Sequence, residues 1–147
     1  MSFVRIWVHF VWGTKNREAF LNKDNRDAII NHIKENAKQK CIYIDCINSG
    51  NDHIHCLISL NPNESLSKTV QLIKGESSYW INKSNLVPNK FEWGDEYFAV
   101  SVSESAVQAI REYIRNQEEH HKKKTWTEEY QEFIQNYNFD ELRAKAL

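Results

Sequence analysis

The chain has 147 residues, a length typical of one domain, and its 41% hydrophobic content excludes an intrinsically disordered protein. Four glycines and two prolines are too few for a collagen-like or low-complexity chain. The formal net charge of −1 lacks the strong positive charge of a protein that coats DNA non-specifically, so any nucleic-acid binding must come from a local patch.

The cysteines and the N-terminal segment indicate the compartment. The three cysteines, an odd number without Cys-x-x-Cys spacing, favour reduced thiols in the cytoplasm over a disulfide framework. They are Cys41, Cys46 and Cys56. The apolar segment 3–12 contains Arg5 and His9 and lacks a small-residue cleavage site, and no run of about 18 apolar residues follows. We therefore expect neither a signal peptide nor a membrane span, and no membrane partner.

The first half of the chain contains the patterns of three strands and one helix. Residues 3–12 are rich in β-branched and aromatic residues, so they predict a buried strand. Residues 24–40 carry apolar side chains at helical spacing and predict a helix. Residues 41–48 and 53–60 alternate between apolar and polar, with turn-forming residues 49–52 between them, and so predict a β-hairpin.

The second half begins with a predicted helix and a predicted strand. Ser65 can cap a helix that continues to about Lys83. Residues 97–103 have the composition of a fourth strand. Ser105 and Gln108 form the pattern of a capping box, which opens a helix through about residue 124.

The order of these elements predicts the fold class. A last short helix is expected at residues 128–136, and no internal repeat is visible, so residues 1–147 are expected to form a single domain. The first six elements follow the β-α-β-β-α-β order of a ferredoxin-like fold. We therefore predict an α+β protein, with a four-stranded antiparallel sheet, two helices on one face and an added C-terminal helix that carries Tyr113.

A pair of histidines lies in the third predicted strand. The period of two in Asp52-His53-Ile54-His55 puts His53 and His55 on one face, away from the core. Their spacing of roughly 6.5 to 7 Å along a strand lets both imidazoles reach one metal ion. A His-x-His triplet also arises by chance, so the pair alone does not decide between a metal site and a chance occurrence.

A tyrosine and a glutamine share one face of the last main helix. Tyr113 and Gln117 are four residues apart, and their face borders an apolar stripe. The stripe consists of Val107, Ile110 and Ile114. A tyrosine beside such a stripe is ordinarily a packing residue with its hydroxyl at the surface, so this motif alone does not establish a functional role.

Taken together, the two motifs resemble the single-tyrosine HUH transposases, small enzymes of insertion sequences that move as single-stranded DNA. The residues that carry the resemblance are the strand motif 52–55 and the helical segment 113–117. The likeness covers about residues 3–124 and leaves the aromatic tail 125–147 unexplained. It implies a ferredoxin-like sheet with the histidines on a central strand and the tyrosine on a late helix.

The resemblance also implies the chemistry of the site. In the family, a divalent ion is held by residues that match His53, His55 and Gln117, and the nucleophile matches Tyr113. The implied reaction cleaves and rejoins single-stranded DNA through a 5′-phosphotyrosine intermediate. Mg²⁺ or Mn²⁺ suits the amide and phosphate oxygens, although two imidazoles would also accept zinc. The cysteines are expected to be core or bystander residues.

The partners implied are hairpin DNA and a second copy of the chain. Family members work as dimers, so Tyr113 and Gln117 are expected to act either within one chain or in trans on the histidines of the partner copy. Candidate DNA-binding residues are chosen by charge alone. They are Lys15, Arg17, Lys68, Lys74, Arg111, Arg115 and Lys122.

Two other functions compete with a metal-dependent transposase. One is a non-catalytic module that binds single-stranded nucleic acid by stacking bases on exposed aromatics such as Trp7 or Trp12. The other is a metal hydrolase that uses the histidine pair and a water nucleophile. The hydrolase would turn over small phosphodiesters without forming a covalent adduct with DNA.

Overall fold

The chain divides into two compact units, Met1–Gln117 and Glu118–Leu147. The computed structural model describes residues 2–117 of the first unit and residues 125, 128, 129, 131 and 132 of the second. The four described residues from 128 to 132 are helical, and the remainder of the predicted helix 128–136 lies outside the described residues. A single domain over 1–147 stays a prediction.

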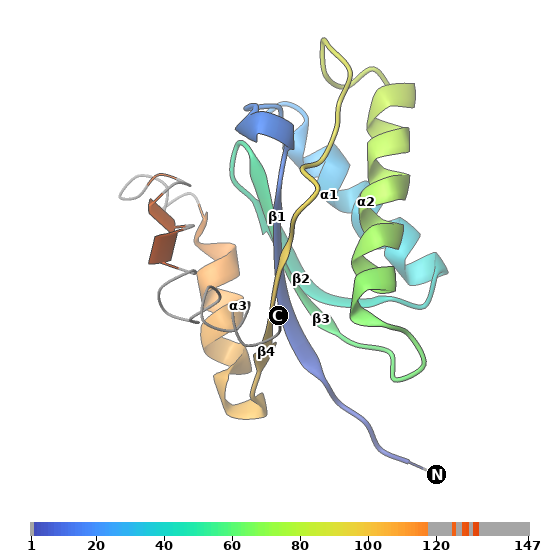
Figure 1. Cartoon of the computed structure of the whole chain (residues 1–147), viewed down its shortest axis with the longest axis vertical. Helices are drawn as coiled ribbons and strands as arrows, with labels where there is room; N and C mark the ends of the chain where they lie inside the picture. Colours follow the sequence, from blue (N-terminus) through green and yellow to red (C-terminus); the bar gives the residue numbers. More distant parts are fainter. Residues whose placement is uncertain (1, 118–124, 126–127, 130, 133–147) are drawn as a thin grey trace, which may run out of the picture. The chain divides into compact units, whose positions relative to one another are not determined.

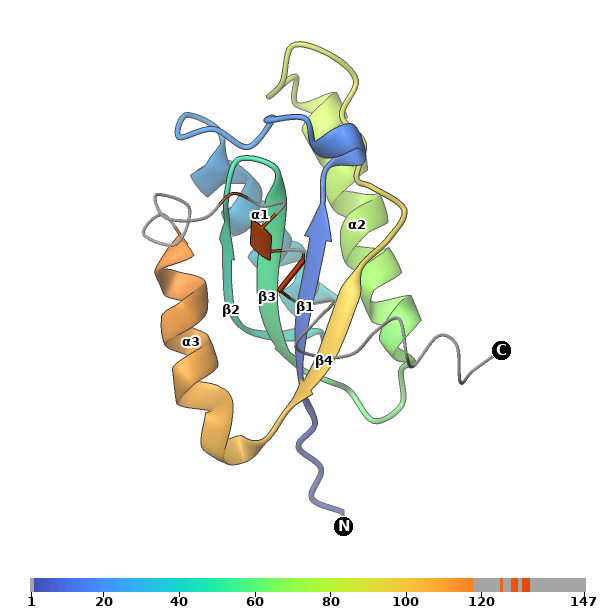
Figure 2. The ribbon, with the colours of Figure 1, turned by 60° about the vertical axis from the view of Figure 1, so that its left-hand side comes forward.

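The first unit is built on a four-stranded antiparallel sheet. Its strands are β1 (Trp7–Gly13), β2 (Tyr43–Ser49), β3 (His53–Ser59) and β4 (Phe98–Val102). They lie in the order β2-β3-β1-β4, as Figure 2 shows, so β3 and β1 are the central strands. The predicted α+β fold with β-α-β-β-α-β order is confirmed.

Helices cover both faces of this sheet. The two helices α1 (Arg26–Gln39) and α2 (Leu66–Lys83) lie on one face, and α3 (Val107–Arg115) lies over β2 and β3 on the other (Figure 1). Short 3-10 turns follow β1 at Lys15–Arg17 and precede α3 at Glu104–Ala106. None of the helices in the described part of the chain is long and apolar enough to cross a membrane.

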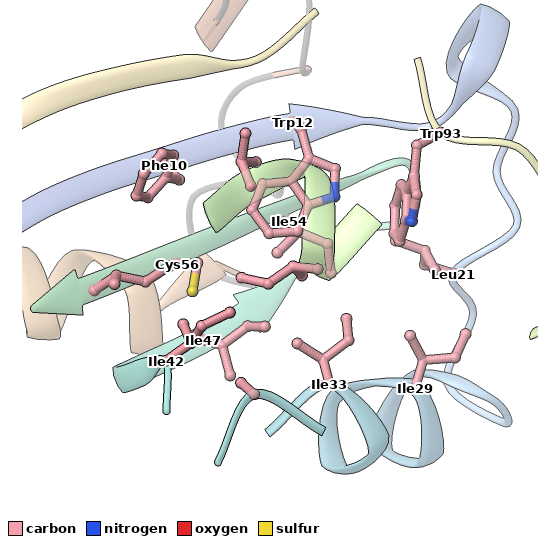
Figure 3. Packing of buried hydrophobic residues seen from close by; sticks show 14 of the residues in the cluster. Phe10, Trp12, Leu21, Ile29, Ile33, Ile42, Ile47, Ile54, Cys56 and Trp93 are labelled. Carbon is pink, nitrogen blue, oxygen red and sulfur yellow. The ribbon is translucent and has the colours of Figure 1, made fainter. Parts of the chain in front are cut away.

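Alternate residues of the central strands divide the core between the two faces. Phe10 and Trp12 of β1 and Ile54 of β3 lie in the main core together with Ile29 and Ile33 of α1 (Figure 3). The intervening residues point to the opposite face, where two of them form a second apolar cluster with residues of α3. That cluster consists of Trp7, Leu57, Val107 and Ile114. The second cluster docks α3 against the sheet.

Of the two helix N-termini predicted from capping residues, one is confirmed and one is wrong. The cap at Ser65 is confirmed, because its hydroxyl accepts a hydrogen bond of 3.1 Å from the backbone N–H of Lys68. The capping box at Ser105 and Gln108 is wrong: Ser105 lies inside the 3-10 turn, and Ala106 precedes α3 without a side-chain cap. The chain enters α3 through that turn, so no N-terminal cap is formed by a hydroxyl. α3 ends at Arg115, and residues 118–124 of its predicted extension lie outside the described residues.

The first strand is shorter than predicted. It begins at Trp7 rather than at residue 3, because both neighbours end there: Trp7 pairs with Ser59 of β3 and with Val102 of β4. Phe3, beyond these partners, is 92% exposed. The apolar composition of residues 3–6 therefore overstated the length of the strand.

Candidate active site

The predicted histidine pair lies on the central strand β3, on the face that α3 covers. His53 and His55 are fully buried, and their ligand nitrogens lie within 4.8 Å of one another. Bonds from imidazole nitrogen to a metal are about 2.1 Å long, so the two rings could hold one ion after a small adjustment. The pair therefore has the donor set and spacing for a metal ion.

Asp52 orients the first of these imidazoles. Its carboxylate oxygen Oδ1 lies 2.8 Å from Nδ1 of His53, at the start of β3. A carboxylate can only accept here, so Nδ1 carries the proton and donates it. Such a bond fixes the ring and presents the other nitrogen, Nε2, to a metal.

Gln117 brings an amide oxygen to the same nitrogen. Its Oε1 lies 3.4 Å from Nε2 of His53, while its Nε2 donates to the backbone carbonyl of Tyr113 at 3.2 Å. The second bond turns the amide so that its oxygen faces the imidazole. All three predicted ligands are thus brought together by the fold.

Tyr113 lies beside the histidines on the preceding turn of α3. Its half-buried ring packs edge-on against His55, with centroids 5.4 Å apart, and its centroid lies 6.1 Å from that of His9. Because α3 and β3 belong to the same unit, one chain places the tyrosine next to its own histidine pair. A trans arrangement between two copies stays a prediction.

Two polar side chains of β2 hold the helix that carries Tyr113. The guanidinium of Arg111 donates to both carboxylate oxygens of Asp45, at 2.7 and 2.8 Å. The amide of Asn48 donates to the carbonyls of Ile114 and Arg115, at 2.9 and 3.2 Å. Carbonyls in the last turn of a helix lack partners within it, so Asn48 satisfies groups that would otherwise need water.

A β-bulge in β2 turns two consecutive side chains toward α3. The register with β3 shifts between Ile44 and Cys46, which inserts Asp45 as an extra residue. Asp45 therefore bonds to α3, and the next residue, Cys46, packs against the cluster under the same helix. Regular alternation would turn one of these neighbours to the opposite face.

Replacing Asn48 with alanine is expected to loosen the end of α3. Loss of two hydrogen bonds should lower the free energy of unfolding by about 1 to 2 kcal/mol. Urea denaturation followed by circular dichroism measures this. Asn63→Ala, in an exposed turn, is the matched control and should change stability by less than about 0.5 kcal/mol. Equal stability of the two variants would show that Asn48 does not hold the helix.

His9 is a member of the site that the sequence analysis missed. It lies on β1, is 3% exposed, and its Nε2 is 3.0 Å from Nδ1 of His55. Burial, and secondarily the charge on His55, lowers the pKa of His9 to about 3, so this imidazole is neutral at neutral pH. The sequence did contain a signal for this role: His9 is a polar residue inside an apolar strand, and a buried polar residue needs a buried partner.

Cys46 and Cys56 do not supply reactive thiolates. Burial raises the pKa of Cys46 to about 11 and that of Cys56 well above its ordinary value. Both thiols are therefore protonated at neutral pH, and Cys56 packs in the main core. Cys41 is exposed, and none of the three forms a disulfide.

The predicted DNA-binding residues come from several elements, and two of them contact the segment 92–94. Lys15 pairs with Glu92 at 3.0 Å, and Lys74 donates to the carbonyl of Gly94 at 2.6 Å. Arg111 is held by Asp45, as described above. The three other described candidates are exposed and lie after β1, in the first turn of α2 and at the end of α3, and Lys122 lies outside the described residues. They are Arg17, Lys68 and Arg115, and their role in binding stays a prediction.

The tryptophans proposed as an exposed stacking platform are buried. Trp12 is 1% exposed and packs edge-on against Trp93 in the main core. Trp7 is 7% exposed, lies in the cluster under α3, and donates from its indole nitrogen to Glu104 at 2.6 Å. The expectation was wrong because helices cover both faces of the sheet.

Comparison with known proteins places this chain in a family. Residues 2–117 match the model of the family described as "Transposase IS200 like". The chain belongs to this family. The single-tyrosine HUH resemblance read from the sequence is confirmed, and the IS200-like transposase is similar along most of its length to the ISDra2 transposase TnpA of Deinococcus radiodurans. The two are 26% identical over 115 residues, which cover 74% of this chain and 81% of the relative.

Two solved structures share the fold of this IS200-like transposase. A candidate transposase from Deinococcus radiodurans R1 superposes with a TM-score of 0.64 at 23% identity, covering 79% of this chain and 93% of its own. A REP-associated tyrosine transposase, bound to a REP hairpin, superposes with a TM-score of 0.61 at 15% identity. That match covers 82% of this chain and 72% of the other.

Proposed function

We propose that this IS200-like transposase cleaves and rejoins single-stranded DNA through Tyr113, at a divalent metal site formed by His53, His55 and Gln117. The observation that carries the proposal is the meeting of two distant motifs in one chain. The amide oxygen of Gln117 lies 3.4 Å from Nε2 of His53, and the ring of Tyr113 packs against His55. The proposed nucleophile therefore lies beside three neutral donors that could hold one ion.

The donor set fits a divalent ion. The amide oxygen and the phosphate oxygens suit Mg²⁺ or Mn²⁺, and the two imidazole nitrogens would also accept zinc. When bound, the ion supplies Lewis acidity toward the phosphate oxygens. Because no protein ligand in this set is charged, the positive charge of the site is kept for the DNA backbone.

The proposed reaction conserves the energy of the phosphodiester bond. The hydroxyl oxygen of Tyr113 attacks phosphorus, the bond from phosphorus to the 3′ oxygen breaks, and the leaving oxygen takes a proton to become a 3′-hydroxyl. A 5′-phosphotyrosine results. A phenol with an ordinary pKa near 10 is a good leaving group, so a DNA 3′-hydroxyl can later displace it. Neither ATP nor water is consumed.

The proposed substrate is single-stranded DNA that contains a hairpin. The REP-associated tyrosine transposase shares this fold and is bound to a REP hairpin, which supports DNA of that kind as the substrate class here. We place catalysis within one chain, since Tyr113 lies beside its own histidine pair. A homodimer that exchanges α3 between copies is the alternative arrangement.

The experiment mixes the full chain with single-stranded oligonucleotides carrying varied hairpins in the presence of Mn²⁺. A denaturant-stable adduct that retains the 3′ portion of the oligonucleotide, and that EDTA prevents, is the expected result. Binding of the same oligonucleotides without any adduct would favour a binding module. Turnover of a small phosphodiester without an adduct would favour a hydrolase.

A further inference from the structure

We infer that His9 is a positioning residue for the metal site, because it holds His55 in the tautomer that presents Nε2 to the ion. This inference rests on the proposed function, since it assigns a role in the same site. It adds a supporting residue from a second strand, β1, to proposed ligands that lie on β3 and just after α3.

The register of the sheet brings the two imidazoles together. Val11 of β1 is the direct partner of His55, and His9 lies two residues away on the same face of β1. His9 is therefore the diagonal neighbour of His55, a position from which long and aromatic side chains can touch. The rings have centroids 5.2 Å apart, and Nε2 of His9 lies 3.0 Å from Nδ1 of His55.

The hydrogen bond decides which nitrogen of His55 is available to a metal. A neutral imidazole carries one proton, so His55 can bind an ion through Nε2 only when its proton is on Nδ1. The N–H at Nδ1 of His55 then donates a hydrogen bond to Nε2 of His9. His9 can accept this bond because its own proton is on Nδ1. A hydrogen bond of this kind from the far nitrogen is the usual support of a metal-binding histidine.

The two predicted histidine ligands have supports of different charge. His53 donates to the Asp52 carboxylate, whose side chain is 20% exposed, whereas His55 is supported by the uncharged His9 in the interior. A carboxylate at the position of His9 would be costly to bury. It would also reduce the net positive charge of the loaded site. A neutral acceptor fixes the tautomer without either penalty.

If His9 served only to fill space, its substitutions would have different effects from those expected of a positioning residue. If His9 only fills space, an apolar side chain of similar size should serve as well. If it acts as an acceptor, glutamine should replace it better than leucine, because its Oε1 can take the place of Nε2. The comparison of His9→Gln with His9→Leu therefore separates packing from positioning.

Nuclear magnetic resonance of the metal-free full chain, labelled with ¹⁵N-histidine, tests the tautomer directly. We expect His55 to carry its proton on Nδ1 in the wild type and in His9→Gln, and to shift toward the Nε2 tautomer in His9→Leu. A wild-type His55 protonated on Nε2 would overturn the inference. This readout needs neither metal nor DNA, so it is independent of the proposed activity.

Titration with Co²⁺, monitored by the visible absorption of the bound ion, tests whether His9 contributes to metal affinity. His9→Leu should weaken Co²⁺ binding by about 10- to 100-fold, with His9→Gln closer to the wild type. Val8→Ala, which removes volume from the opposite face of β1, is the control and should leave Co²⁺ affinity unchanged. Equal Co²⁺ affinities for wild type and His9→Leu would refute the positioning role. Normal tautomer and Co²⁺ results without a DNA adduct would instead refute the proposed function alone.

Discussion

Substitution of Tyr113 with phenylalanine is expected to abolish the covalent adduct while oligonucleotide binding stays near the wild-type level. The change removes one oxygen and keeps the ring that packs against His55 and His9. Removing a nucleophile from an otherwise intact site lowers the rate by about a thousandfold or more. Adduct formation on denaturing gels, together with a binding titration on the same hairpin oligonucleotide, measures both quantities.

The matched control for this variant is Tyr79→Phe. Tyr79 lies on α2 and is 65% exposed, so loss of its hydroxyl should leave both the adduct and the binding unchanged. Tyr113→Phe protein that still forms the adduct would place the nucleophile on another residue. Loss of oligonucleotide binding in Tyr113→Phe, but not in Tyr79→Phe, would instead assign Tyr113 to substrate recognition.

Local periodicity in the sequence predicted much of the site. The period of two in β3 placed His53 and His55 on one face, and the helical spacing of Tyr113 and Gln117 placed them one turn apart. Both patterns are properties of consecutive residues, so a sequence is enough to read them. The order of the elements likewise predicted the sheet and its two covering helices.

The remaining features depend on contacts between distant segments. His9 becomes a neighbour of His55 only through the register of β1 against β3, which depends on how the whole sheet assembles. The bulge at Asp45 has no composition that marks it, and it turns Asp45 and Cys46 to the same helix. Burial of Trp7 and Trp12 likewise follows from helices packing on both faces of the sheet. These features therefore depend on pairing and packing between segments that are far apart in the sequence, which local periodicity does not predict.

In the turn between β2 and β3, Gly50 leaves space for the ring of His53. A Cβ placed on Gly50 would lie 2.6 Å from Cε1 and 3.1 Å from Nδ1 of that imidazole. The backbone N–H of Gly50 also donates to the carbonyl of His53 at 3.0 Å, so the turn cannot simply move away. The ring itself is buried and bonded to Asp52, and any shift displaces the nitrogen that faces Gln117.

Gly50→Ala is therefore expected to weaken Co²⁺ binding by about 10- to 100-fold and to reduce adduct formation correspondingly. Overpacking should also cost about 1 to 3 kcal/mol of stability, which urea denaturation measures. Gly75→Ala is the matched control, since nothing lies within 4 Å of a Cβ at that exposed helical position. It should stabilise the protein by about 0.5 to 1 kcal/mol and leave Co²⁺ affinity unchanged. If folded Gly50→Ala protein binds Co²⁺ as tightly as Gly75→Ala does, His53 is not a ligand in the observed orientation, because the substituted side chain cannot coexist with that ring.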